Sequence, residues 1–146
     1  MSSINDRFKI TGKLSIALNG AVVQEVDNLV TTAGKGYVAN RMRNDVSGGV
    51  ALMSHMAIGS GTTNPVVGDT ALETERGRVA LTSTAVSAAV VTYVATFPAG
   101  TGTNAITEAG ILNAASSGTL LCRTEFDVVN KGASDAMTIT WTVTVS

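Results

Sequence analysis

The sequence predicts an all-β fold with one short helix, arranged as an antiparallel, jelly-roll-like β-sandwich. The clearest observation is the C-terminal segment 136–146, AMTITWTVTVS, in which apolar residues alternate with threonines. This alternation is typical of a strand that buries one face. Similar short segments recur upstream between turn signals, without long strand–helix–strand units. Their even spacing favours a sandwich or barrel over a parallel α/β fold.

The pattern of alternation and turn residues defines the individual elements. Asn19-Gly20 supplies the two positive-φ positions that a type I′ turn requires, so it predicts a hairpin. Thr31 is a typical N-cap, and the apolar spacing after it predicts a short helix within residues 31–42. The expected strands are residues 8–18, 21–26, 53–58, 79–84, 86–97, 105–112, 119–129 and 136–146.

The longest expected loop is glycine-rich and spans residues 59–68. We expect Gly59 and Gly61 to permit a tight turn with positive φ. Asp69 is then expected to cap a single helical turn that seats Leu72 in the core. The loop is therefore interpreted as part of the fold rather than as a binding loop.

Length and composition predict a single domain whose surface is in lasting contact with other protein molecules. We assign residues 1–7 to a flexible N-terminal arm and residues 8–146 to a single β-sandwich domain. Charged residues make up 14% of the chain, against about 25% in typical proteins. The net charge of −1 argues against nucleic acid or an anionic membrane as partner, and no apolar run is long enough to span a membrane.

The chain carries few residues suited to catalysis or cofactor binding. The sequence around Gly34, Lys35 and Gly36 lacks the spacing of a phosphate-binding P-loop. His55 is the only histidine, whereas a metal site needs several ligands. Cys122 is the only cysteine and is expected to be a small buried side chain, made in a reducing cytosol. We expect no catalytic, cofactor-binding or metal-binding residue.

Several carboxylates lie close in sequence to arginines. A glycosidase would need two carboxylates about 5 to 10 Å apart in a cleft, usually with aromatic side chains that stack on sugar rings. The chain has only six aromatic residues, so we interpret the charges as ion pairs that fix loops or as pairs across a subunit interface, with Glu108 and Arg123 paired across neighbouring strands. The residues concerned are Glu73, Glu75, Glu108, Glu125, Arg76, Arg78 and Arg123.

Six short motifs occur in a fixed order and together cover roughly residues 29–146. They are AIGSGTT at 57–63, DTAL at 69–72, YVATF at 93–97, ITEAGIL at 106–112, LCRTEF at 121–126 and ITW at 139–141. Their order resembles that of small phage virion proteins with a compact β fold. This resemblance implies a non-enzymatic role in virion assembly.

Within that family the chain most resembles a capsid cement, or decoration, protein. The resemblance implies a protein assembled in the host cytoplasm and bound to the outer capsid surface of the virion. Its implied partners are the major capsid protein and further copies of itself, as a dimer or trimer. The motifs also recur in tail fibres and baseplates, so a module that recognises a host surface is the alternative, and a small carbohydrate-active enzyme is a third. One short domain without a coiled-coil or collagen-like shaft favours the capsid.

Overall fold

The computed structural model describes residues 8–43 and 49–146. Within these ranges the chain forms nine antiparallel strands and one α-helix, which confirms the predicted all-β class. The predicted arm at residues 1–7 lies outside the described residues. The elements are β1 (Ile10–Leu18), β2 (Ala21–Val30), α1 (Thr32–Arg41), β3 (His55–Gly59), β4 (Glu75–Ala80), β5 (Ser83–Ser87), β6 (Val90–Phe97), β7 (Asn104–Leu112), β8 (Leu120–Lys131) and β9 (Met137–Val145).

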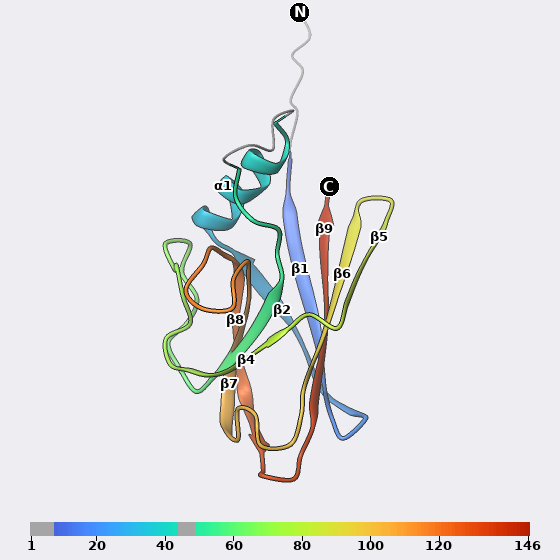
Figure 1. Cartoon of the computed structure of the whole chain (residues 1–146), viewed down its shortest axis with the longest axis vertical. Coiled ribbons are helices and arrows are strands. Elements are labelled where there is room, and N and C mark those ends of the chain that lie inside the picture. The colour runs from blue at the N-terminus through green and yellow to red at the C-terminus, as the bar shows by residue number, and fades with distance from the viewer. Residues whose placement is uncertain (1–7, 44–48) are drawn as a thin grey trace, which may run out of the picture.

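The nine strands form one curled sheet in the order β4-β3-β7-β8-β2-β1-β9-β6-β5. The sheet curls at β2, which pairs with β1 along most of its length and with β8 only at Leu29 and Val30. Its two halves therefore face each other and share one large apolar core (Figure 1). The jelly-roll-like arrangement is not confirmed, because the nine strands are hydrogen-bonded neighbours within this single curled sheet.

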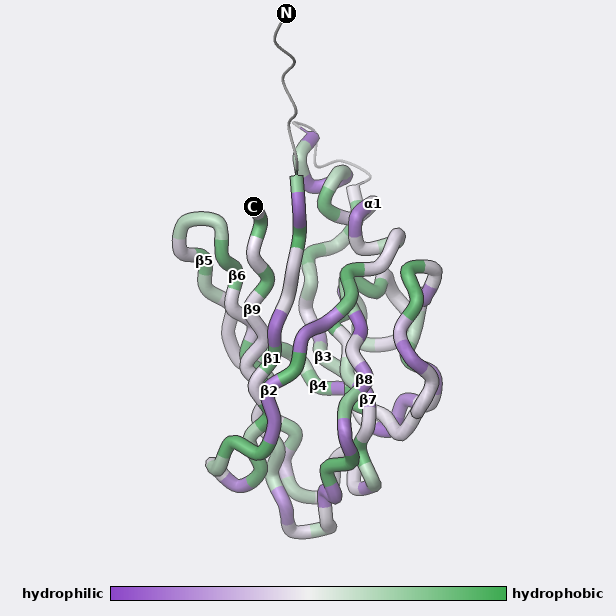
Figure 2. Tube along the Cα trace, turned by 180° about the vertical axis from the view of Figure 1, so that it is seen from behind, coloured by the Kyte–Doolittle hydropathy of each residue, from purple (hydrophilic) through white to green (hydrophobic). Residues whose placement is uncertain are grey.

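The predicted first hairpin is confirmed. Asn19 and Gly20 have φ values of 51° and 86° and connect β1 to β2. The second strand is longer than expected, because its last residues leave β1 and pair with β8. Along β9 the predicted alternation also holds, with Trp141 buried among apolar neighbours and the threonines on the opposite face. Figure 2 shows hydrophobic and hydrophilic residues following one another along these strands.

The predicted helix forms and begins at the predicted cap. Thr31 Oγ1 accepts a hydrogen bond from the Gly34 amide at 2.9 Å and donates one to the Leu120 carbonyl at 2.8 Å. Thr31 therefore stabilises the first turn of α1 and fixes it to β8 at the same time. Glycine at position 34 has a packing reason, because a Cβ atom there would collide with the backbone of Leu121.

The strand expected at residues 86–97 is wrong in one respect. A two-residue turn at Ala88 and Ala89 divides this region into β5 and β6, which pair as a hairpin. Ala88 has a φ of 51°, a conformation that alanine rarely adopts, so no turn signal was visible in the sequence. The strand expected at residues 79–84 is also wrong in its bounds, since β4 spans Glu75–Ala80 and residues 83 and 84 belong to β5.

Trp141 is the largest fully buried side chain and is held by a specific polar contact. Its indole Nε1 donates a hydrogen bond to Asn28 Oδ1 at 2.7 Å. The Asn28 side chain lies directly over Gly12, where a Cβ atom would occupy the same space. The hydrogen bond between Trp141 and Asn28 thus links β9 to β2 across β1. Glycine at position 12 of β1 leaves the space that the Asn28 side chain occupies.

Replacing Trp141 with alanine is expected to lower the free energy of unfolding by about 3 to 5 kcal/mol, because it leaves a large cavity and an unpaired Asn28 oxygen. Chemical denaturation measures this loss. Val128→Ala, a change at an exposed valine, is the control and should alter stability by less than about 0.5 kcal/mol. Equal effects of the two substitutions would contradict the central place of Trp141 in the core.

Candidate functional site

The most highly connected polar group of the described residues is the carboxylate of Glu108, which is fully buried on β7. Its Oε2 accepts hydrogen bonds from the amides of Gly61 and Thr74, both at 2.7 Å. Its Oε1 accepts from the Glu73 amide at 2.8 Å and from Arg123 Nε at 3.0 Å. Both oxygens are therefore saturated, and this carboxylate holds the segment between β3 and β4 on the sheet.

Arg123 on β8 completes the cluster and is also buried. Besides Glu108, its guanidinium binds Asp69 Oδ2 at 3.0 Å and the carbonyl of Thr63 at 3.0 Å. The predicted pairing of Glu108 with Arg123 is confirmed. The expected role of Asp69 is wrong: no helical turn follows it, and its carboxylate instead binds Arg123 and the amide of Val66.

The two glycines of the loop serve close packing rather than unusual backbone angles. Neither Gly59 nor Gly61 has a positive φ, so the expected role in a positive-φ turn is wrong. A Cβ atom at Gly59 would collide with the Thr74 carbonyl, and one at Gly61 would collide with the Glu108 carboxylate. Glycine at these positions lets the backbone approach the buried carboxylate closely enough to donate to it.

Leu72 is buried as expected, but not in the main core. It packs in a separate cluster with Ala57, Leu112 and Leu120, on the opposite face of the sheet from the main core. The segment between β3 and β4 therefore covers the outer face of β3, β7 and β8. This cover, together with the Glu108 cluster, buries both faces of that half of the sheet.

The other carboxylates are separate from this cluster in their contacts. Glu75 forms a bidentate ion pair with Arg78, with distances of 2.6 and 3.0 Å. Hydrogen bonds from the Thr63 hydroxyl and the Thr62 amide lower the pKa of Glu73 below its ordinary value. Glu125 lies opposite Glu108 in the ladder of β7 and β8. Of these three glutamates, Glu75 forms an ion pair as interpreted, whereas the contacts of Glu73 are hydrogen bonds within its loop.

The remaining groups with reactive potential lie apart from one another. His55 is half-buried, with Nδ1 at 2.7 Å from the Ser54 hydroxyl. Cys122 is fully buried in the core, and burial raises the pKa of its thiol well above the ordinary value. Among residues 8–43 and 49–146, no group of three or more histidines, cysteines and carboxylates is close enough to hold a metal ion.

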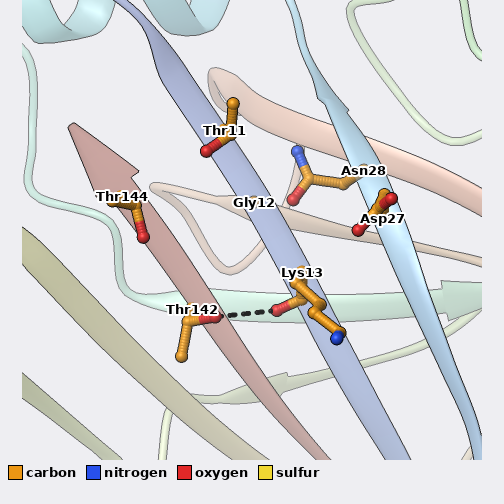
Figure 3. A pocket seen from close by; sticks show the side chains of 7 residues that line it. All are labelled: Thr11, Gly12, Lys13, Asp27, Asn28, Thr142 and Thr144. Atoms are coloured by element: carbon orange, nitrogen blue, oxygen red, sulfur yellow. Dashed lines mark hydrogen bonds between the residues drawn. The ribbon is translucent and has the colours of Figure 1, made fainter. Parts of the chain in front are cut away.

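One broad surface stands out for its chemistry rather than for a buried group. The outward side chains of β9 are all threonines, the flanking strands β1 and β6 add Thr11, Thr92 and Thr96, and we call this surface the threonine face. Its pairs in register include Thr11 with Thr144 and Thr92 with Thr142. A shallow cavity of about 400 Å³ lies where it meets β2, and Thr142 Oγ1 donates to the Lys13 carbonyl at 3.2 Å there (Figure 3).

A second surface feature is an apolar groove between α1 and the sheet. Two adjoining cavities of about 350 and 340 Å³ share Ile10, Val38 and Met42 in their linings. Phe8 and Met42 are mostly exposed at its rim. The groove and the threonine face lie on opposite sides of β1, since Ile10 points inward and Thr11 outward.

Comparison with known proteins identifies no relative: no family model, no curated protein and no solved structure matches this chain. No helix in the described part of the chain is both long and apolar enough to cross a membrane.

Sequence reasoning located the Glu108–Arg123 pair but missed the threonine face. The alternation of threonines in residues 136–146 was its visible signal. What could not be read from the sequence is that β1 and β6 flank β9 and add their own threonines in register. A surface of this kind arises only when strands distant in sequence pair.

Replacing Glu108 with glutamine is expected to destabilise the protein by about 3 to 5 kcal/mol, because the buried guanidinium of Arg123 then keeps only the partly exposed Asp69 as a charged partner. One carboxylate oxygen also becomes an NH₂ group that faces backbone amides. Chemical denaturation measures the loss, and amide hydrogen exchange at Gly61 and Thr74 should accelerate. Glu25→Gln, at an exposed glutamate on β2, is the matched control. The clamp role would be contradicted if both variants unfolded alike.

Proposed function

We propose that this chain is a phage virion structural protein, and that it acts as a capsid cement protein. In this proposal it binds the outer surface of the head and stabilises contacts between major capsid proteins. The resemblance of its six motifs to small virion proteins motivates the assignment. The threonine face is the structural observation that supports it best.

The residues that carry the resemblance occupy structural positions in this chain. Glu108 and Arg123 clamp the loop between β3 and β4, and Trp141 fills the core. Such residues define a scaffold, and they are too buried to contact a large partner. A binding function therefore has to use the exterior of the sheet.

The threonine face has the properties expected of an extended protein-binding surface. Its side chains are half-buried or exposed, and they belong to strands that are paired on both sides within the sheet. Threonine offers a methyl group and a hydroxyl with only one side-chain torsion to order, so its burial costs little entropy. The charged residue of this face is Lys13 on β1, and Glu25 and Asp27 lie next to the face on the adjoining strand β2.

A cement protein gains its effect from many modest contacts rather than from one tight site. Each copy would bury a patch across a junction between capsid subunits, and the contributions of all copies would add over the particle. A low-charge face suits this role, because neighbouring copies bound to the same particle repel each other weakly.

The number of copies per particle tests the proposal directly. We expect purified virions to contain this protein in hundreds of copies, in a fixed ratio to the major capsid protein, because cement follows the capsid lattice. Quantitative mass spectrometry of the particles measures this ratio. A content of tens of copies or fewer would refute the cement role and favour the alternative, a tail-fibre or baseplate module that recognises a host surface.

A charge placed on the threonine face tests the proposed surface. Thr140 is exposed near the middle of β9, so Thr140→Arg should leave the fold intact. We expect it to weaken binding of the purified protein to heads that lack it by at least about tenfold. Thr103→Arg, at an exposed threonine outside the strands, is the control and should bind like the unaltered protein. Equal binding by all three proteins would indicate that the capsid contact lies on another surface of the protein.

A further inference from the structure

The strand β5 forms one edge of the sheet and is exposed along its whole length. In the part of the chain that the structure describes, β6 is its only neighbouring strand. All five residues from Ser83 to Ser87 are exposed. Figure 1 shows the β5–β6 hairpin at the side of the molecule, apart from α1. An uncovered edge of this kind is a template for pairing with another strand.

The peptide groups that point outward from this edge follow from the hairpin register. Ser87 and Val90 flank the two-residue turn, and such a pair exchanges backbone hydrogen bonds. Bonded and non-bonded pairs then alternate along the ladder, so Ala85 bonds to β6 while Thr84 and Val86 direct their peptide groups outward. Two N–H and two C=O groups are thereby offered by each copy.

The two edges of the sheet differ in charge. Residues 79–107, which include β5 and β6, contain no aspartate, glutamate, lysine or arginine in 29 positions. The opposite edge, β4, carries Glu75, Arg76 and Arg78, and Arg78 also binds the carbonyls of Ala114 and Ser117 at 2.9 Å. Charged residues on an edge strand oppose pairing, so β4 is protected and β5 is not.

Val86 adds an apolar contact to this open edge. It lies opposite Val91 in the ladder, and Val91 lines the apolar groove. Val86 therefore belongs to the inward-facing side of the sheet, yet it is 72% exposed because the sheet ends there. A strand added at β5 would cover it.

We propose that β5 pairs with β5 of a second copy of this chain, in an antiparallel arrangement about a two-fold axis at Ala85. In this register Thr84 of each copy pairs with Val86 of the other, and all outward peptide groups of both residues are used. A two-fold axis at Thr84 would instead pair Val86 with Thr82, whose amide is already bonded to the Val94 carbonyl at 2.7 Å. An axis at Val86 would reach into the turn.

A second copy fits this edge better than a strand of another kind. Two identical strands meet across the axis, and neither brings a charge, so no like charges are opposed. The protected β4 edge prevents head-to-tail growth, and the assembly closes at two copies. The inference concerns the isolated chain and does not depend on the proposed binding to a capsid.

The axis position predicts a specific cross-link. Two Ala85 residues would face each other as a non-hydrogen-bonded pair, with Cα atoms about 4.5 Å apart, within the range that a disulfide requires. We expect Ala85→Cys to form a covalent dimer under mild oxidation, seen by non-reducing electrophoresis. Val128→Cys is the control at an exposed site on β8 and should stay uncoupled. The native Cys122 is buried.

Equilibrium sedimentation of the isolated protein provides the second measurement. The unaltered chain should dimerise at micromolar concentration, and Val86→Lys should weaken the dimer at least about tenfold by placing two lysines across the axis. Val128→Lys should have no effect. A monomeric unaltered chain at high micromolar concentration would overturn the proposal, as would a dimer that Val86→Lys leaves intact. Either result would leave the capsid proposal untouched, since that is tested on particles.

Discussion

The buried carboxylate of Glu108 is the contact on which much of this structure depends. It receives three backbone amides and the guanidinium of Arg123, and it thereby joins β7, β8 and the segment between β3 and β4. A carboxylate without such partners could not stay charged in the interior. Glycine is needed at positions 59 and 61 because a side chain at either position would keep the backbone from approaching the Glu108 carboxylate.

The sheet has two unlike halves, and the Glu108 cluster lies in one of them. The half that contains β3, β7 and β8 is covered on both faces, by the main core on one side and by the Leu72 cluster on the other. The half that contains β1, β9 and β6 buries one face and presents threonines on the other. The two halves therefore differ in how much of the sheet is left exposed.

The division also explains how the chain could assemble without aggregating. Its open half ends in an uncharged edge at β5, while the edge at β4 is protected by the ion pair of Glu75 with Arg78, and Arg78 also binds carbonyls of the loop between β7 and β8. One open edge permits a closed pair of copies, whereas two would permit a fibre. The two proposed contacts use different parts of the same half-sheet, the face for the capsid and the edge for a second copy.

Local patterns account for those features that depend on neighbouring residues alone. The Asn19-Gly20 turn, the Thr31 cap and the alternation in β9 were all predicted, because each follows from backbone geometry over a few residues. The buried pair of Glu108 and Arg123 was also anticipated, since the two residues lie on consecutive strands.

Features that depend on distant residues were decided by the tertiary structure. The positive φ of Ala88 is imposed by pairing on both sides of the turn, and no residue type there announces it. Asp69 was assigned to a helix cap, but Arg123, 54 positions away, binds it instead. By itself the sequence determined the fold class, the first hairpin and the helix, because those rest on local propensity. Only the tertiary structure decided the loop clamp, the threonine face and the open edge, because each requires strands far apart in sequence to come together.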